Sequence, residues 1–219
     1  MMKKSGDKCN MKKKITSYIA NKYTNEDDAM IIMDLKIDNF LAFKNFHMNM
    51  AYPKKIVNSY IPNEHLKDRS NFRYKKVNIL MGSNATGKTS IGKMLMAICN
   101  FMKRKDVLGL IDKVADLEKE ATISIDFVGK SFKMYRLDIE IQPGMDDENL
   151  PEIFVCKRIV TIEEKDRYET CAKKIENMPQ KYTDDYKSEL QNIEPIGWMF
   201  TYPSDMGNEP MSLPDDKAF

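Results

Sequence analysis

Residues 82–89, Gly-Ser-Asn-Ala-Thr-Gly-Lys-Thr, constrain the fold of this chain more than any other stretch, because they match the pattern G-x-x-x-x-G-K-[ST]. The apolar run at 77–81 precedes them and has the composition of a buried strand. The residues that follow carry apolar side chains at the i, i+3, i+4, i+7 spacing of an amphipathic helix: Ile91, Met94, Leu95 and Ile98. Strand, glycine-containing loop and helix, in that order, form the structural context in which this pattern binds phosphate.

Each residue type in the loop has a chemical reason. Gly82 and Gly87 let the backbone curl so that successive N–H groups point at phosphate oxygens, and the start of the helix adds a partial positive charge. Lys88 is expected to reach the β- and γ-phosphates, and the Thr89 hydroxyl is expected to hold Mg²⁺. The predicted nucleotide-binding residues of this stretch are Gly82, Ser83, Asn84, Ala85, Thr86, Gly87, Lys88, Thr89 and Ser90.

The composition is that of a soluble globular protein, with 31% charged and 42% hydrophobic residues. The net charge of +2 does not by itself imply a polyanionic partner. No apolar run approaches the length of a membrane span, and the N-terminus lacks the apolar core of a signal peptide. We therefore expect a cytoplasmic protein without a membrane partner.

The cysteines and histidines do not predict a metal site. Cys9, Cys99, Cys156 and Cys171 lie far apart and form no C-x-x-C pair, so neither a disulfide framework nor a zinc site is indicated. No cysteine or acidic cluster with metal-ligand spacing surrounds either histidine. We expect reduced, partly buried thiols.

The chain divides into four segments. Residues 1–28 are predicted to be a flexible basic leader, since 1–22 contain seven lysines and one aspartate; a basic arm that contacts nucleic acid is the alternative interpretation. Residues 29–162 are predicted to form the core, with a β-subdomain. Residues 163–203 are predicted to be an incomplete helical segment, and residues 204–219 a disordered tail.

Apolar periodicity predicts the elements within these segments. Alternation predicts β-structure at 30–38, 46–50 and 122–141, with a bulge near Met134, and residues 152–162 are predicted to be another β stretch. Between them, residues 51–76 show little period and are predicted to be a long loop or insertion. Helical spacing predicts helices at 107–117 and up to Pro179, followed by a shorter helix that Thr183 caps.

Two stretches of this chain resemble the N-terminus of RecF/SMC-type ATPases, which include the bacterial "AAA family ATPase" proteins of the ABC-ATPase-like class. The hallmark of that class is an opening strand that ends in an Asn-Phe turn, followed by a loop of the form G-x-N-x-x-G-K-[ST]. Asn39, Phe40 and Asn84 fit this hallmark. Ala85 departs from the usual glycine and Thr89 from the commoner serine. The predicted β-structure at 122–141 fits the β-subdomain of the class.

The resemblance implies an α/β fold: the N-terminal half of a P-loop NTPase, with a mixed sheet, an antiparallel β-subdomain and helices toward the C-terminus. It implies ATP and Mg²⁺ as ligands, with hydrolysis coupled to conformational change and nucleic acid as a candidate partner. It also implies that Phe43 lies against adenine and Lys44 near a phosphate, because the turn at 39–44 would lie beside the loop. Dimerisation through the nucleotide interface, or pairing with a downstream half, is expected.

Two motifs of the class are missing from the sequence. No apolar strand ends in Asp-Glu (the Walker B element), and no Ser-Gly-Gly signature occurs. Asp112 follows an apolar run, but that run has helical spacing and Lys113 stands where glutamate would be required. The chain therefore resembles the N-terminal portion of a longer ATPase, with ATPase activity expected only when these motifs complete it.

Two alternatives remain open. A nucleoside or nucleotide kinase shares the loop, but it needs arginines on the phosphates, and Arg167 is the only arginine from position 160 onward. A GTPase is disfavoured because no Asn-Lys-x-Asp follows the loop. A non-catalytic nucleotide-binding interaction module is consistent with the missing Walker B element.

Overall fold

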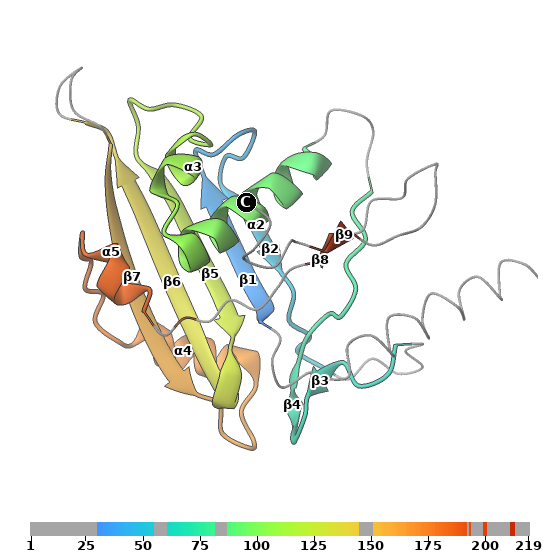
Figure 1. Ribbon diagram of the computed structural model, residues 1–219. Coiled ribbons are helices and arrows are strands. Elements are labelled where there is room, and N and C mark those ends of the chain that lie inside the picture. The colour runs from blue at the N-terminus through green and yellow to red at the C-terminus, as the bar shows by residue number, and fades with distance from the viewer. Residues whose placement is uncertain are drawn as a thin grey trace, which may run out of the picture.

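The computed structural model describes residues 30–54, 61–81, 87–144, 151–191, 193, 199–200 and 211–212. Its centre is a five-stranded sheet in which every neighbouring pair is antiparallel (Figure 1). In sheet order the strands are β2 (Phe46–Asn49), β1 (Ile31–Asp38), β5 (Ala121–Val128), β6 (Lys133–Gln142) and β7 (Glu152–Thr161). The helices are α2 (Lys88–Arg104), α3 (Val107–Ile111), α4 (Tyr168–Glu176) and α5 (Tyr186–Glu189). Two short hairpins are β3 (His65–Leu66) with β4 (Arg69–Arg73), and β8 (Met199–Phe200) with β9 (Met211–Ser212).

Helix α2 packs on one face of the sheet, which Figure 1 shows in front. The predicted helix is formed and begins at Lys88, and the four apolar residues predicted for its inner face are all buried. They meet strand residues that alternate toward the same side, such as Leu35, Ile125 and Leu137. The chain is therefore α/β, with an antiparallel sheet and a few helices.

The opposite face of the sheet carries buried charges beneath α4. Arg136 of β6 forms a two-bond ion pair with Asp126 of β5, at 2.6 and 2.7 Å. The Tyr168 hydroxyl of α4 donates to the same carboxylate at 2.8 Å. Burial, and then the neighbouring Asp126, raise the pKa of Tyr168 far above its ordinary value. A second buried pair joins Arg158 of β7 to Asp138 of β6 at 2.5 Å. These bonds pair charges that would otherwise be costly to bury, although the buried Nε of Arg158 has no hydrogen-bond partner.

The prediction of a bulge near Met134 is wrong. The β5–β6 register runs without interruption from Ala121↔Ile141 to Val128↔Met134. The turn at 129–132 places odd-numbered residues opposite odd-numbered ones, so the apolar side chains of both strands already share one face. The register shift in the sheet lies instead in β1, between Ile32 and Asp34.

The loop predicted for 51–76 contains the β3–β4 hairpin. Its apolar contribution is small, since Leu66 and Phe72 are the buried hydrophobic side chains of these two strands. That is too few to produce a visible alternation in the sequence. Arg69 of β4 places its guanidinium 4.3 Å from the centre of the Phe132 ring, which links the hairpin to the β5–β6 turn.

Two helix predictions also need correction. α3 ends at Ile111 rather than near 117, because Val114 forms a bridge with Phe40. α5 begins at Tyr186, and its cap is Asp185, which accepts from the Ser188 N–H at 3.1 Å. Thr183 does not cap the helix; it bridges to Val155 at the edge of β7.

The leader predicted at 1–28 lies outside the described residues, as does most of the tail predicted at 204–219. Within the described ranges, no helix combines the length and the apolar character that a membrane crossing requires.

Candidate functional site

The N-terminus of α2 follows a glycine in the left-handed conformation. Gly87 has φ +82° and precedes Lys88, the first residue of the helix. Its carbonyl accepts from the N–H groups of Ser90 and Ile91 at 3.0 and 3.3 Å, which starts the helical bonding. No acidic side chain lies in the first turn of the helix, so its own sequence does not neutralise the partial positive charge there. Thr89, the second residue of the helix, is exposed.

A turn between β1 and β2, residues 39–45, is fixed by Asn39. The Asn39 side-chain nitrogen donates to the carbonyls of Asp116, Lys119 and Glu120, at 2.8 to 3.1 Å. Its side-chain oxygen accepts from the Asp116 N–H at 3.1 Å. The next residue, Phe40, is fully buried. The turn is therefore anchored to the segment that leads into β5.

Phe43 projects from this turn toward the start of α2. A Cβ atom added to Gly87 would lie 4.0 Å from Cε1 of Phe43, which is ordinary contact distance. On its other side the Phe43 ring packs against Phe46, with 4.7 Å between ring centres. The structure thus brings Phe43 next to Gly87. Lys44 follows Phe43 and is exposed.

The structure describes only some of the other predicted site residues. Gly82, Ser83, Asn84, Ala85 and Thr86 lie outside the described residues. Lys88 and Ser90 are half-buried in the first turn of α2. Sequence reasoning noted Asn39 as part of a family hallmark but did not find its anchoring role. That role depends on carbonyls far along the chain, which no local pattern indicates.

The strand predicted at 77–81 is not formed, and that prediction is wrong for this structure. Among the described residues, no strand pairs with this segment, which Figure 1 draws as a coil apart from the sheet. Its apolar side chains are exposed: Val77, Ile79, Leu80 and Met81. An apolar run becomes a buried strand only when a neighbouring strand satisfies its backbone groups.

The described residues contain no group of three or more His, Cys, Asp or Glu side chains arranged to hold a metal ion. His47 instead makes a 2.8 Å bond to Asp34, and His65 makes a 2.9 Å bond to the Leu66 carbonyl. Cys99, Cys156 and Cys171 are free and buried, and burial raises the pKa of the Cys99 thiol to about 12.

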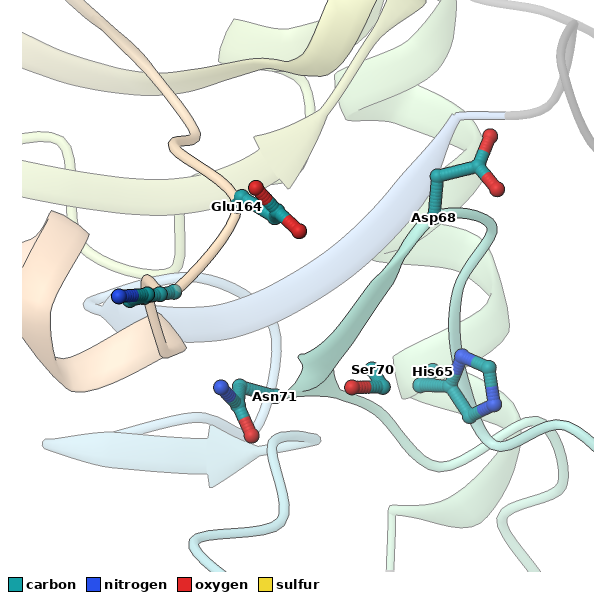
Figure 2. Close-up of a pocket in the computed structure, with 6 residues that line it drawn as sticks. His65, Asp68, Ser70, Asn71 and Glu164 are labelled. Carbon is teal, nitrogen blue, oxygen red and sulfur yellow. The ribbon is translucent and has the colours of Figure 1, made fainter.

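A separate hollow of about 340 Å³ lies between the β3–β4 hairpin and the segment after β7. Figure 2 shows its labelled side chains coming from these two segments without converging on one point. Its lining is polar: His65, Asp68, Ser70, Asn71, Glu164 and Lys165. It shares no residue with the Phe43–Gly87 site, and its arrangement indicates no chemistry.

Comparisons of this chain with protein-family models, with curated proteins and with solved structures found no match.

Proposed function

We propose that this chain binds ATP with Mg²⁺ at the N-terminus of α2, as part of a P-loop ATPase of the RecF/SMC-like class. The observation that carries the proposal is that the Phe43 ring lies beside Gly87. This glycine has the left-handed backbone conformation and directly precedes Lys88, the first residue of α2. A loop of the matching sequence ends at that point.

The phosphate part of the proposal rests on charge and backbone geometry. The helix N-terminus offers partial positive charge without a first-turn acid to cancel it. Lys88 would contact the β- and γ-phosphates, and the exposed Thr89 hydroxyl would be the protein ligand of Mg²⁺. The sequence of residues 82–86 supplies the remaining backbone N–H groups.

The base part of the proposal rests on the turn at 39–45. Phe43 is only partly buried, and Phe46 supports its ring from behind. An aromatic ring held beside the phosphate site can stack on adenine. The exposed Lys44 would contribute a positive charge near the phosphates.

Within the wider class, the antiparallel sheet would correspond to the β-subdomain. ATP hydrolysis coupled to conformational change would need the Walker B and signature motifs. A partner chain in a homodimer, or a downstream half, would supply them. Nucleic acid is the candidate target. A non-catalytic nucleotide-binding module would use the half-buried Lys88 and the Phe43 turn in the same way as an ATPase. A measurement of ATP turnover therefore distinguishes the ATPase from the non-catalytic module.

Isothermal titration calorimetry with Mg-ATP tests the binding proposal. Lys88→Ala should lower the affinity about tenfold or more, because it removes a charge-assisted contact to phosphate. Lys93→Ala is the matched control, since Lys93 is an exposed lysine in the second turn of the same helix. Equal affinities for the wild type and Lys88→Ala would reject the phosphate-binding assignment.

A further inference from the structure

The backbone groups of β7 point alternately into the sheet and out of its edge. β7 is the last strand of the described sheet, at the left in Figure 1. The Val155 N–H and carbonyl both bond to Thr183 at 2.9 Å, on the side away from β6. After the strand, the Ile162 N–H donates to the Phe132 carbonyl on the β6 side at 2.8 Å. Because the bonding direction alternates along an antiparallel strand, the odd-numbered residues of β7 direct their backbone groups outward.

The open part of this edge is short and is closed at both ends. At one end Val155 is already bonded, and at the other the Glu163 N–H donates to the Asp166 carboxylate at 3.0 Å. Three outward-facing residues remain between these ends: Lys157, Ile159 and Thr161. Among the described residues, no backbone hydrogen bond reaches the outward groups of these three. Ile159 therefore lies at the centre of the open stretch, equally far along the chain from either closed end.

The features that commonly protect an edge strand are missing from this stretch. Such strands are often blocked by a proline, a bulge or a lysine that projects into solvent. β7 contains no proline, and its register with β6 runs without interruption. Its lysine, Lys157, is turned onto α5, where Nζ donates to the Glu189 carbonyl and lies 3.4 Å from the Glu189 carboxylate. The edge is therefore able to accept another strand.

A row of apolar side chains ends at the same place. Ile159 lies opposite Tyr135 of β6, and Tyr135 lies opposite Phe127 of β5. The two aromatic rings stack with 5.1 Å between their centres. Ile159 continues this row, yet its side chain is 38% exposed because no strand lies beyond it in the described sheet. A partner strand with an apolar residue opposite Ile159 would cover it.

We infer that this edge pairs with β7 of a second copy of the chain, antiparallel and about a two-fold axis at Ile159. In this register Ile159 opposes its own equivalent, and Lys157 opposes Thr161 of the second copy. All the open groups then find open partners, because the open stretch is symmetric about Ile159. An axis at Lys157 or at Thr161 would instead bring an open residue against a closed one. The apolar row becomes continuous across the two sheets.

Charge and bulk are compatible with this register. Lys157 of each copy lies diagonally across from Glu163 of the other, within reach of a long side chain. Helix α5 contacts the strand at Lys157, so the two α5 helices lie toward opposite ends of the paired stretch and away from the axis. The stretch is short, so the contact is weak and reversible. It lies at the sheet edge opposite β2, and it does not depend on the nucleotide-binding function proposed above.

Sedimentation velocity over a concentration series tests the pairing. The wild-type chain should pass reversibly from monomer to dimer between about 1 µM and about 1 mM, the range for a small interface. Ile159→Lys should weaken the association about tenfold or more, because it places two lysines opposite each other at the axis. Leu108→Lys is the matched control: Leu108 is 68% exposed and lies on α3, so this variant should associate like the wild type. Far-UV circular dichroism checks the fold of both variants.

Amide exchange by NMR on the wild-type chain provides a second measurement that needs no substitution. The N–H groups of Lys157, Ile159 and Thr161 should become protected as the protein concentration rises, because they bond to the second copy. Those of Arg158 and Val160 should be protected at every concentration, because they bond to β6.

Four results would overturn the inference. The first is a chain that stays monomeric over the whole series. The second is association that Ile159→Lys does not weaken, since the contact would then lie on another face. The third is protection of the outward N–H groups in the monomer, which would assign the edge to a segment of the same chain. The fourth is association that needs Mg-ATP and is lost in Lys88→Ala, which would assign the dimer to the nucleotide interface. Absence of ATP binding would reject the proposed function and leave the edge pairing to be decided by sedimentation and exchange.

Discussion

Asn39 joins two distant parts of the chain through a single side chain. Its φ of +60° lies in the left-handed region, which asparagine tolerates better than most residues. The side-chain amide bonds to the segment at 116–120, and the Asn39 carbonyl accepts from the Ala115 N–H at 3.0 Å. The position of Phe43 therefore depends on the side chain of Asn39.

Two substitutions of Asn39 separate its hydrogen bonds from its backbone conformation. Asn39→Gly keeps the left-handed backbone but loses the side-chain bonds, so the free energy of unfolding should fall by about 2–3 kcal/mol. Asn39→Ala adds the strain of a Cβ atom at positive φ and should cost about 1 kcal/mol more. Urea denaturation measures both. A smaller loss in Asn39→Ala than in Asn39→Gly would contradict the backbone argument.

Phe43 should contribute to recognition of the base and not of the phosphates. Phe43→Ala should weaken ATP binding by about 0.5–1.5 kcal/mol, the size of an aromatic stacking contact. Inorganic triphosphate has no base and should bind both forms equally. Calorimetry with the two ligands gives the comparison, and far-UV circular dichroism checks the fold. Unchanged ATP affinity in a folded variant would remove the stacking role.

At the scale of elements, the start of α4 is held by Asp166. Its carboxylate accepts from Lys174 Nζ at 2.6 Å and from the Glu163 N–H at 3.0 Å. Burial alone raises the pKa of Asp166, but these hydrogen bonds outweigh it and lower the pKa below its ordinary value of 3.8. The ionised carboxylate thus stabilises the folded state above the unfolded-state pKa. This contribution is lost as the pH falls through the folded-state pKa.

Asp166→Asn should therefore reduce the free energy of unfolding by about 1–2 kcal/mol at neutral pH. The difference from the wild type should shrink as the pH falls below about 4, because the wild-type carboxylate also becomes protonated. Denaturation at a series of pH values measures this. The exposed Glu164, two residues away, provides the control Glu164→Gln. A difference that stays constant down to pH 2 would assign the loss to packing.

The elements that could be predicted are the long ones. β1, β5 and β7 are strands of eight or ten residues rich in apolar and β-branched side chains, and α2 shows a helical stripe over 17 residues. The β3–β4 hairpin has too few buried apolar residues to show a period. The segment at 77–81 is the reverse case. Its composition predicts a strand, but a strand forms only beside a partner strand, and the composition of the segment does not identify that partner.

The candidate site could be predicted in part from the same sequence. The pattern at 82–89 located the helix start and Gly87, because only certain residues permit that backbone geometry. Phe43 could be placed beside it only through family resemblance. The anchoring of the turn by Asn39 could not be predicted, since its partners lie some 80 residues away in the chain.

For the whole molecule, ATP binding and ATP hydrolysis should separate. In the proposed function Lys88, Thr89 and Mg²⁺ would neutralise phosphate charge, but transfer to water also needs a group that orients the water. The sequence has no apolar strand ending in Asp-Glu to provide one. The 219-residue chain should therefore bind ATP and hydrolyse it slowly or not at all.

A phosphate-release assay on the purified chain measures this. A polypeptide that carries the Walker B and signature motifs, joined downstream, should restore turnover together with dimerisation. Steady turnover by the chain alone, abolished in Lys88→Ala, would show that a catalytic acid lies within it.

The order of the strands in the sheet also sets an order of assembly. β5, β6 and β7 pair with their immediate neighbours in the chain, as do β1 and β2, whereas the β1–β5 pairing joins segments far apart in sequence. Such long-range pairings close last, because the intervening loop must first lose its entropy. During synthesis, the inner edge of β1 remains unpaired until β5 has left the ribosome. The turn that carries Phe43 is anchored just before β5, so the approach of Phe43 to Gly87 would be fixed only at that late step.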